Sequence, residues 1–203
     1  EVRSMDIQSI HPLVIFFAAI TTNNILLTNF LGMCSFLAVS KDLKSSLGLG
    51  AAVIFVSTFT APLNWLVFHK LLVPFELEYL QYIAFIIVIA AFVQIIEMVV
   101  ERVSTLLYLA LGIFLPLITV NCAILGCALF LVIRQYTFMQ SIAYGLGAGT
   151  GWALAIAALA GIRTRMEKKS KVIPELEGPG IALVITGIIA MAFIGFSGIV
   201  KIN

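Results

Sequence analysis

Two of the three cysteines occupy similar surroundings in a very apolar chain, and soft metal ligation is one chemistry that such thiols offer. Cys34 lies in T-N-F-L-G-M-C-S-F and Cys122 lies in P-L-I-T-V-N-C-A. A disulfide, ordinary hydrophobic packing and metal ligation are all open, although the centre of a cytoplasmic membrane is not an oxidising niche. An iron–sulfur cluster or a tetrahedral thiolate site needs four soft ligands, so a partner would have to supply two more.

Cys127 and Trp152 are expected to have structural roles. Cys127 lies five positions after Cys122, about 140° round a helix, and it has no counterpart in the first half of the chain. We therefore expect it to pack. Trp152, like Trp65, is of a type that favours the membrane interface. The motif G-L-G-A-G-T-G at 145–151 fits neither phosphate-binding fingerprint, so Gly147-x-x-x-Gly151 is predicted to be a close helix-packing face.

The elements that must position these residues are transmembrane helices. Hydrophobic residues make up 62% of the 203 residues and charged residues only 11%, whereas soluble domains carry roughly 25% charged residues. Apolar runs long enough for a ~30 Å hydrocarbon core occur six times, and they are continuous rather than alternating. We expect an all-α membrane protein with one integral membrane domain, 1–203, and no sizeable soluble part. The runs are about 12–39, 47–69, 79–100, 105–133, 140–162 and 179–200.

The two halves of the chain carry the same features in the same order. The matching features are Cys34 and Cys122, glycine-rich helix starts at 45–51 and 143–149, and E-L-E loops at Glu76–Glu78 and Glu175–Glu177. Because three helices per half is an odd number, the second half must enter the membrane from the opposite side. This predicts two inverted repeats, about 12–101 and 102–203, an architecture that places functional sites at the midplane.

Polar and helix-breaking residues are concentrated at bilayer depth in the first and fourth runs. Proline removes a backbone donor, and asparagine side chains can satisfy groups freed by such a break. We therefore expect both helices to be interrupted at the midplane, each presenting its cysteine near the pseudo-two-fold axis. Helix–helix contacts with a routine proline kink are the alternative. The residues concerned are Asn23, Asn24, Asn29, Gly32, Gly112, Pro116 and Asn121.

The distribution of Lys and Arg predicts the orientation. Eight cations on one side against four on the other place the richer side in the cytoplasm, with both termini periplasmic. The 163–178 loop dominates this count as a topology anchor, with docking of a soluble partner as the alternative, and it is too short to bind nucleic acid usefully. The poorer side carries Arg3, Lys70, Arg134 and Lys201; the richer side carries Lys41, Lys44, Arg102, Arg163, Arg165, Lys168, Lys169 and Lys171.

Glu97 is an acid within the third apolar run, between Gln94 and Glu101. An ionisable residue in a transmembrane helix is by default a site on an ion pathway. The alternative is that its carboxylate reaches the membrane interface and pairs with Arg102.

The chain resembles the E-subunit family of the sodium-translocating NADH:quinone reductase, whose close relative is the A subunit of the Rnf ferredoxin:NAD reductase complex. The amino-acid sequence around both cysteines favours the quinone reductase, whereas the string N-N-I-L-L-T-N-F favours Rnf. The resemblance extends over nearly the whole chain. The strings that carry it are F-L-G-M-C-S-F-L-A-V-S-K (30–41), Q-I-I-E-M-V-V (94–100), L-G-I-F-L-P-L-I-T-V-N-C-A-I-L-G (111–126), G-W-A-L-A-I-A-A-L-A-G-I-R (151–163) and F-I-G-F-S-G (193–198).

This resemblance implies that Cys34 and Cys122 bind a [2Fe–2S] cluster together with two cysteines of the homologous D subunit. Asn29 and Asn121 are then candidate hydrogen-bond donors to the cluster, and Glu97 is linked to sodium movement. The chain would be a non-catalytic component of a redox-driven Na⁺ translocase in the bacterial inner membrane, with FAD, FMN and riboflavin found only among the A, B, C, D and F subunits. The A subunit of an Rnf complex is the alternative, and the inverted repeat alone would equally support a secondary transporter with a midplane substrate site.

Overall fold

The computed structural model describes residues 11–103, 115–169 and 179–197, and within these ranges the chain forms helices and turns with no strand. The described part of the protein is therefore all-helical. Four helical stretches in the described ranges are long and apolar enough to cross a membrane: Leu43–Leu72, Glu78–Arg102, Pro116–Ile133 and Phe138–Met166. A shorter apolar helix spans Gly180–Gly195.

The first apolar run is broken into two short helices, as the sequence predicts. α1 (Pro12–Ile20) starts with proline in its first turn, and α2 (Met33–Val39) follows a non-helical linker. Asn24 supports the linker, because its Oδ1 accepts from the backbone N–H groups of Leu26 at 3.1 Å and Leu27 at 3.4 Å. Gly32 ends the linker at a φ of 85°. Neither α1 nor α2 alone is long enough to span a hydrocarbon core.

The next two runs form long helices, and the structure adds details that the sequence did not predict. α3 (Leu43–Val67) is capped by the Asp42 side chain, continues through Pro62, and ends in a π-helical turn, η2 (Phe68–Leu72). Hydrogen bonds from the Ser45 hydroxyl and backbone lower the pKa of the exposed Asp42 carboxyl. α4 (Gln81–Val103) follows a short 3₁₀ turn, η3 (Glu78–Leu80).

The fourth run is also interrupted. α6 (Leu115–Thr119) and α7 (Cys122–Ile133) are separated at Val120 and Asn121. The Asn121 side chain accepts from the Ala123 N–H at 3.0 Å and so caps α7. The predicted second interruption is thus confirmed; Pro116 lies in the first turn of α6, and Gly112 lies outside the described residues.

The predicted 163–178 loop needs a correction. α8 (Phe138–Lys169) continues past residue 162, so the basic residues from 163 to 169 belong to its last turns. Cations are favourable at a helix C-terminus, and a membrane helix can project beyond the hydrocarbon. Residues 170–178, including Glu175–Glu177, lie outside the described ranges, and α9 (Pro179–Ser197) follows them.

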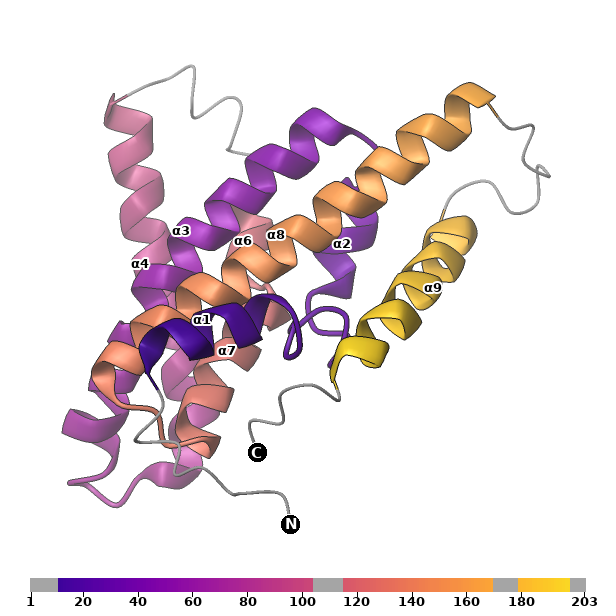
Figure 1. Cartoon of the computed structure of the whole chain (residues 1–203). Coiled ribbons are helices and arrows are strands. Elements are labelled where there is room, and N and C mark those ends of the chain that lie inside the picture. Colours follow the sequence, from indigo (N-terminus) through magenta and orange to yellow (C-terminus); the bar gives the residue numbers. More distant parts are fainter. Residues whose placement is uncertain (1–10, 104–114, 170–178, 198–203) are drawn as a thin grey trace, which may run out of the picture.

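α8 packs closely between α1 and α3, and its glycines make this possible (Figure 1). A Cβ on Gly147 would lie 2.8 Å from the Phe16 carbonyl oxygen of α1, and one on Gly151 would lie 3.0 Å from the Ala19 oxygen. The predicted Gly147-x-x-x-Gly151 packing face is therefore confirmed. Elsewhere on the same helix, a Cβ on Gly145 would lie 2.7 Å from the Ser57 oxygen of α3, and the Ser57 hydroxyl donates to the Gly145 oxygen at 3.0 Å.

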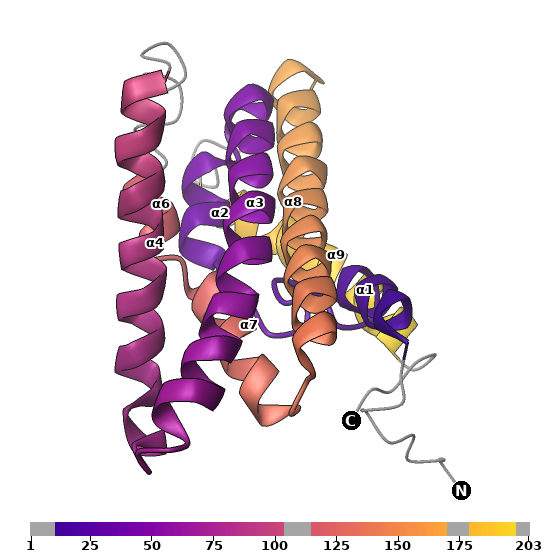
Figure 2. The same cartoon turned by 90° about the vertical axis from the view of Figure 1, so that its left-hand side faces the viewer.

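Two hydrogen bonds show which chain segments share an end of the helix bundle. Arg163 Nη1 donates to Ser40 Oγ at 2.7 Å, which joins the end of α8 to the segment that precedes α3. Trp65 Nε1 donates to the Tyr136 oxygen at 2.7 Å, which joins the other end of α3 to the turn before α8. The start of α3 and the ends of α4 and α8 lie at one end in Figure 2. This matches the predicted grouping of the described cations, while the cytoplasmic assignment of that end stays a prediction.

Candidate metal centre

The interruptions in the first and fourth runs meet inside the molecule. The backbone N–H of Gly32, which precedes α2, donates to Cys122 Sγ at 2.9 Å. Cys122 is the first residue of α7, and Cys34 is the second residue of α2. From this meeting point α2 and α7 run in opposite directions (Figure 2). The structure therefore brings together the two segments that carry the predicted ligands, although they are 88 positions apart in the sequence.

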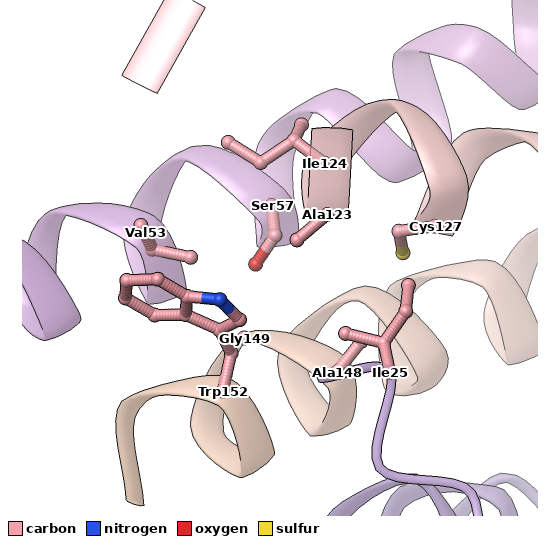
Figure 3. A pocket seen from close by; sticks show the side chains of 9 residues that line it. All are labelled: Ile25, Val53, Ser57, Ala123, Ile124, Cys127, Ala148, Gly149 and Trp152. Carbon is pink, nitrogen blue, oxygen red and sulfur yellow. The ribbon is translucent and has the colours of Figure 1, made fainter. Parts of the chain in front are cut away.

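The three cysteines differ in exposure in a way that separates their roles. Cys34 is exposed on the surface of the chain and Cys122 is half-buried. Cys127 is 2% exposed and lines a small cavity beside Ile25 and Ala148 (Figure 3). Cys34 can therefore be reached by a neighbouring chain, whereas Cys127 lies in the core as a small apolar residue, as expected.

Gly32 is required where it stands for two reasons. Its φ of 85° is in the left-handed region, which L residues with a side chain rarely adopt. A Cβ at this position would also lie 2.5 Å from Trp152 Nε1 and 2.9 Å from Ala123 Cβ. The close approach that only glycine permits places the Gly32 N–H against the Cys122 sulfur.

Two residues that approach Gly32 carry a buried N–H donor without a hydrogen-bond partner among the described residues. Asn121 is 2% exposed, and its Nδ2 makes no hydrogen bond; its Oδ1 lies 3.2 Å from the position of a Gly32 Cβ. Trp152 is 0% exposed, and its Nε1 is likewise unpaired. Such groups are rare in folded proteins because burying an unpaired donor is unfavourable.

Trp152 was missed by sequence reasoning. The expectation of an interfacial tryptophan is wrong, because the Trp152 side chain is fully buried between α3 and α7 residues (Figure 3). Its place in the glycine-rich stretch of α8, where backbones approach closely, was the only available signal. Asn29 is exposed in the linker before α2, and its predicted role as a donor stays a prediction.

Glu97 is half-buried and lies on α4, whereas the cysteines lie on α2 and α7. Its Oε2 accepts from Gln94 Nε2 at 3.1 Å. Arg102 is exposed, and the described residues contain no ion pair between it and Glu97. The alternative in which Glu97 is neutralised by Arg102 is therefore not the arrangement found here.

Comparison of the sequence with known proteins identifies the family of this chain. The family model described as "Rnf-Nqr subunit, membrane protein" matches residues 13–200. The chain belongs to the Rnf-Nqr family. A protein of Psychromonas ingrahamii, named as the E subunit of a Na(+)-translocating NADH-quinone reductase, is 51% identical over 93% of this chain and 98% of its own length. One of the same name from Pseudoalteromonas translucida is 50% identical over the same shares.

The residues of this Rnf-Nqr chain fit one half of an iron–sulfur site. Such a site needs four soft ligands, and the described residues contain no group of three or more His, Cys, Asp or Glu side chains placed to hold a metal ion. The Cys122 thiol accepts from the Gly32 N–H, Cys34 lies two residues after that glycine, and the unpaired N–H donors belong to residues that approach it. These groups suit a thiolate-ligated group of negative charge, whereas hard cations prefer oxygen ligands. The exposure of Cys34 leaves a direction from which another chain can supply the remaining ligands.

Proposed function

We propose that this chain is the membrane-embedded E subunit of a Na⁺-translocating NADH:quinone reductase in a bacterial inner membrane. The two relatives of that name, each matched over nearly its full length, support this assignment. The chain has no catalytic activity by itself in this proposal. Flavins (FAD, FMN and riboflavin) and the site of NADH oxidation belong to the A, B, C, D and F subunits.

We further propose that Cys34 and Cys122 are ligands of a [2Fe–2S] cluster, and that two cysteines of the homologous D subunit complete it. The observation that carries this proposal is the contact between the Gly32 N–H and Cys122 Sγ, which brings the two cysteine-bearing helix starts together. When bound, such a cluster supplies one-electron transfer within the membrane. The residues of this chain hold two of its thiolate ligands, direct the Gly32 N–H towards Cys122, and exclude water with buried side chains such as Trp152.

Reciprocal contacts between α3 and α8 support an inverted repeat around this centre. A Cβ on Gly50 of α3 would lie 3.0 Å from Ala153 Cβ of α8, and a Cβ on Gly149 of α8 would lie 2.9 Å from Ile54 Cα of α3. The difference between 50 and 149 is 99, as is the difference between 54 and 153. With this offset, Gly50 corresponds to Gly149 and Ile54 corresponds to Ala153. The contact of Gly50 with Ala153 is therefore the symmetric copy of the contact of Gly149 with Ile54, as expected across a two-fold axis.

Glu97 is proposed to contribute negative charge to a sodium route along α4. Its carboxylate is half-buried and has Gln94 as its hydrogen-bond partner. An ionisable side chain in a transmembrane helix is costly unless it serves a pathway or a pair, and the described residues contain no ion pair between Glu97 and Arg102, which was the alternative. Sodium prefers oxygen ligands, as other hard cations do.

Two alternatives make different predictions for the purified complex. The A subunit of an Rnf complex, which the string N-N-I-L-L-T-N-F favours, would belong to an assembly that exchanges electrons between ferredoxin and NAD. A secondary transporter would be colourless and would bind its solute without other subunits. Measuring iron, visible absorbance and NADH:quinone activity of the same preparation separates the three possibilities.

The cluster ligands are tested by three matched substitutions in the complete complex. Cys34→Ser and Cys122→Ser each replace a soft thiolate by a harder, less acidic hydroxyl, in surroundings where water cannot easily substitute. Each should lose the iron–sulfur signal in electron paramagnetic resonance (EPR) of the reduced complex, together with quinone reduction. Because the site is shared, each should also loosen the D subunit.

Cys127→Ser is the matched control, because it also replaces a cysteine sulfur by oxygen and Cys127 lies in the same helix as Cys122. This variant should keep the EPR signal and the activity, and it should lose only a modest amount of folding stability because a hydroxyl is buried in an apolar environment. Full iron content and turnover in either Cys34→Ser or Cys122→Ser would overturn the ligand assignment. Loss of the signal in Cys127→Ser alone would do the same.

A further inference from the structure

The indole N–H of Trp152 is a buried donor that finds no acceptor in the described part of the chain. The side chain is 0% exposed, and Nε1 has no hydrogen-bond partner among the described residues. In contrast, Trp65, the other tryptophan of the chain, donates its Nε1 proton to the Tyr136 oxygen at 2.7 Å. A buried unpaired N–H is unfavourable, so an acceptor that is absent from this chain alone is expected at Trp152.

The polar groups of the protein near the indole hydrogen-bond to other partners. Ser57 Oγ donates to backbone oxygens of Gly145 and Ile54, and Asn121 Oδ1 accepts from the Ala123 N–H. In Figure 3 the nitrogen lies on the edge of the indole that faces Ser57 and Ala123. None of these groups accepts a hydrogen bond from Trp152.

A water molecule is a poor substitute for the missing acceptor. The adjoining cavity has a volume of only about 10 Å³, which is the lower limit for holding one water. Its lining is almost entirely apolar and includes Ile25, Val53 and Ile124. A buried water needs two to four polar partners, and a water bonded to Trp152 would find the Ser57 hydroxyl as its second polar side chain in this lining, a group that already donates to backbone oxygens.

The indole nitrogen is directed at the segment that meets the Cys122 sulfur. It lies 2.5 Å from the position that a Gly32 Cβ would occupy, and the Gly32 N–H itself donates to Cys122 Sγ at 2.9 Å. Asn121, whose Nδ2 is also unpaired, approaches the same glycine. The Trp152 indole and the Asn121 side chain therefore both approach Gly32, whose own N–H already donates to the Cys122 thiol.

We propose that the Trp152 indole N–H donates to cluster sulfur at or next to Cys122, and so raises the reduction potential of the iron–sulfur cluster. This inference rests on the proposed function. Reduction adds negative charge to the cluster, and hydrogen bonds to sulfur stabilise the more negative state. Trp152 thus tunes the potential by a direct hydrogen bond and without ligating iron.

The test compares Trp152→Phe with Trp65→Phe in the complete complex, because both variants remove one indole N–H and retain an aromatic ring. Redox titration followed by the EPR signal gives the midpoint potential of the cluster. Trp152→Phe should lower it by an amount equivalent to about a tenfold change in the reduction equilibrium constant, about 59 mV for a one-electron couple. Trp65→Phe should leave it unchanged. An unshifted potential in Trp152→Phe would overturn the inference.

An isotope measurement tests the inference without altering Trp152. In the Trp65→Phe background Trp152 is the single tryptophan, so ¹⁵N-indole labelling of this chain marks one nitrogen. Pulsed EPR of the reduced complex should detect its hyperfine coupling to the cluster. A normal cluster signal without this coupling would overturn the role of Trp152 and leave the cluster standing. No cluster signal in the unaltered complex would overturn both proposals.

Discussion

Replacing Gly32 by alanine perturbs the contact on which the candidate metal centre depends. The backbone there has a φ of 85°, and the left-handed conformation costs a residue with a side chain about 1–2 kcal/mol. The new Cβ would lie 2.5 Å from Trp152 Nε1 and 2.9 Å from Ala123 Cβ, and overpacking of this kind typically costs about 1–3 kcal/mol. We expect Gly32→Ala to destabilise the chain by roughly 2–5 kcal/mol and to displace the Gly32 N–H from Cys122 Sγ.

The matched control for this substitution is Gly48→Ala. Gly48 lies in α3, and an added Cβ there has no neighbour within 4 Å, so alanine should be neutral or stabilise by about 0.5–1 kcal/mol. Thermal denaturation of the purified complex and the EPR signal of the reduced cluster are measured for both variants. We expect a lower midpoint and a shifted or weakened signal for Gly32→Ala only. A Gly32→Ala complex that matches the unaltered one in both measurements would refute this reasoning.

Two further predictions concern orientation and sodium. A cysteine introduced at 165–172 should resist impermeant thiol reagents in intact cells and react in inside-out vesicles, because eight cations place that end in the cytoplasm; the opposite labelling pattern would reverse the topology. Glu97→Ala should weaken the sodium dependence of turnover while keeping the cluster signal, and Glu97→Asp should retain more activity because it preserves the charge. Unchanged sodium activation in both Glu97 variants would instead favour a carboxylate that merely reaches the membrane interface.

The interruptions of the first and fourth helices could be predicted because they depend on local chemistry. Proline, glycine and asparagine disrupt or satisfy the helical hydrogen-bond ladder wherever they occur. Asn24 and Asn121 act as expected: each bonds backbone N–H groups at a break through its side-chain oxygen. The packing face at Gly147 and Gly151 was predictable for a similar reason, since small residues permit close approach of helices.

Features that depend on distant contacts could not be predicted. Nothing near Trp152 in the sequence indicates that Gly32, 120 positions earlier, approaches its indole nitrogen. α8 extends beyond residue 162, and Arg163 within this extension is 6% exposed and donates to Ser40 Oγ at 2.7 Å. Basic residues after an apolar run indicate where the apolar run ends, but not whether the helix continues.

The central claim is that two thiolates of this chain form half of a cluster shared with a second protein of the complex. Experimental density for the intact complex, examined at the contact between Gly32 and Cys122, tests it most directly. We expect strong density for a two-iron group, bonded to Cys34 and Cys122 on one side and to two cysteines of the neighbouring chain on the other, with Trp152 Nε1 facing its sulfur atoms. Density in which Cys34 or Cys122 is a free thiol, or in which one chain supplies all four ligands, would contradict the claim.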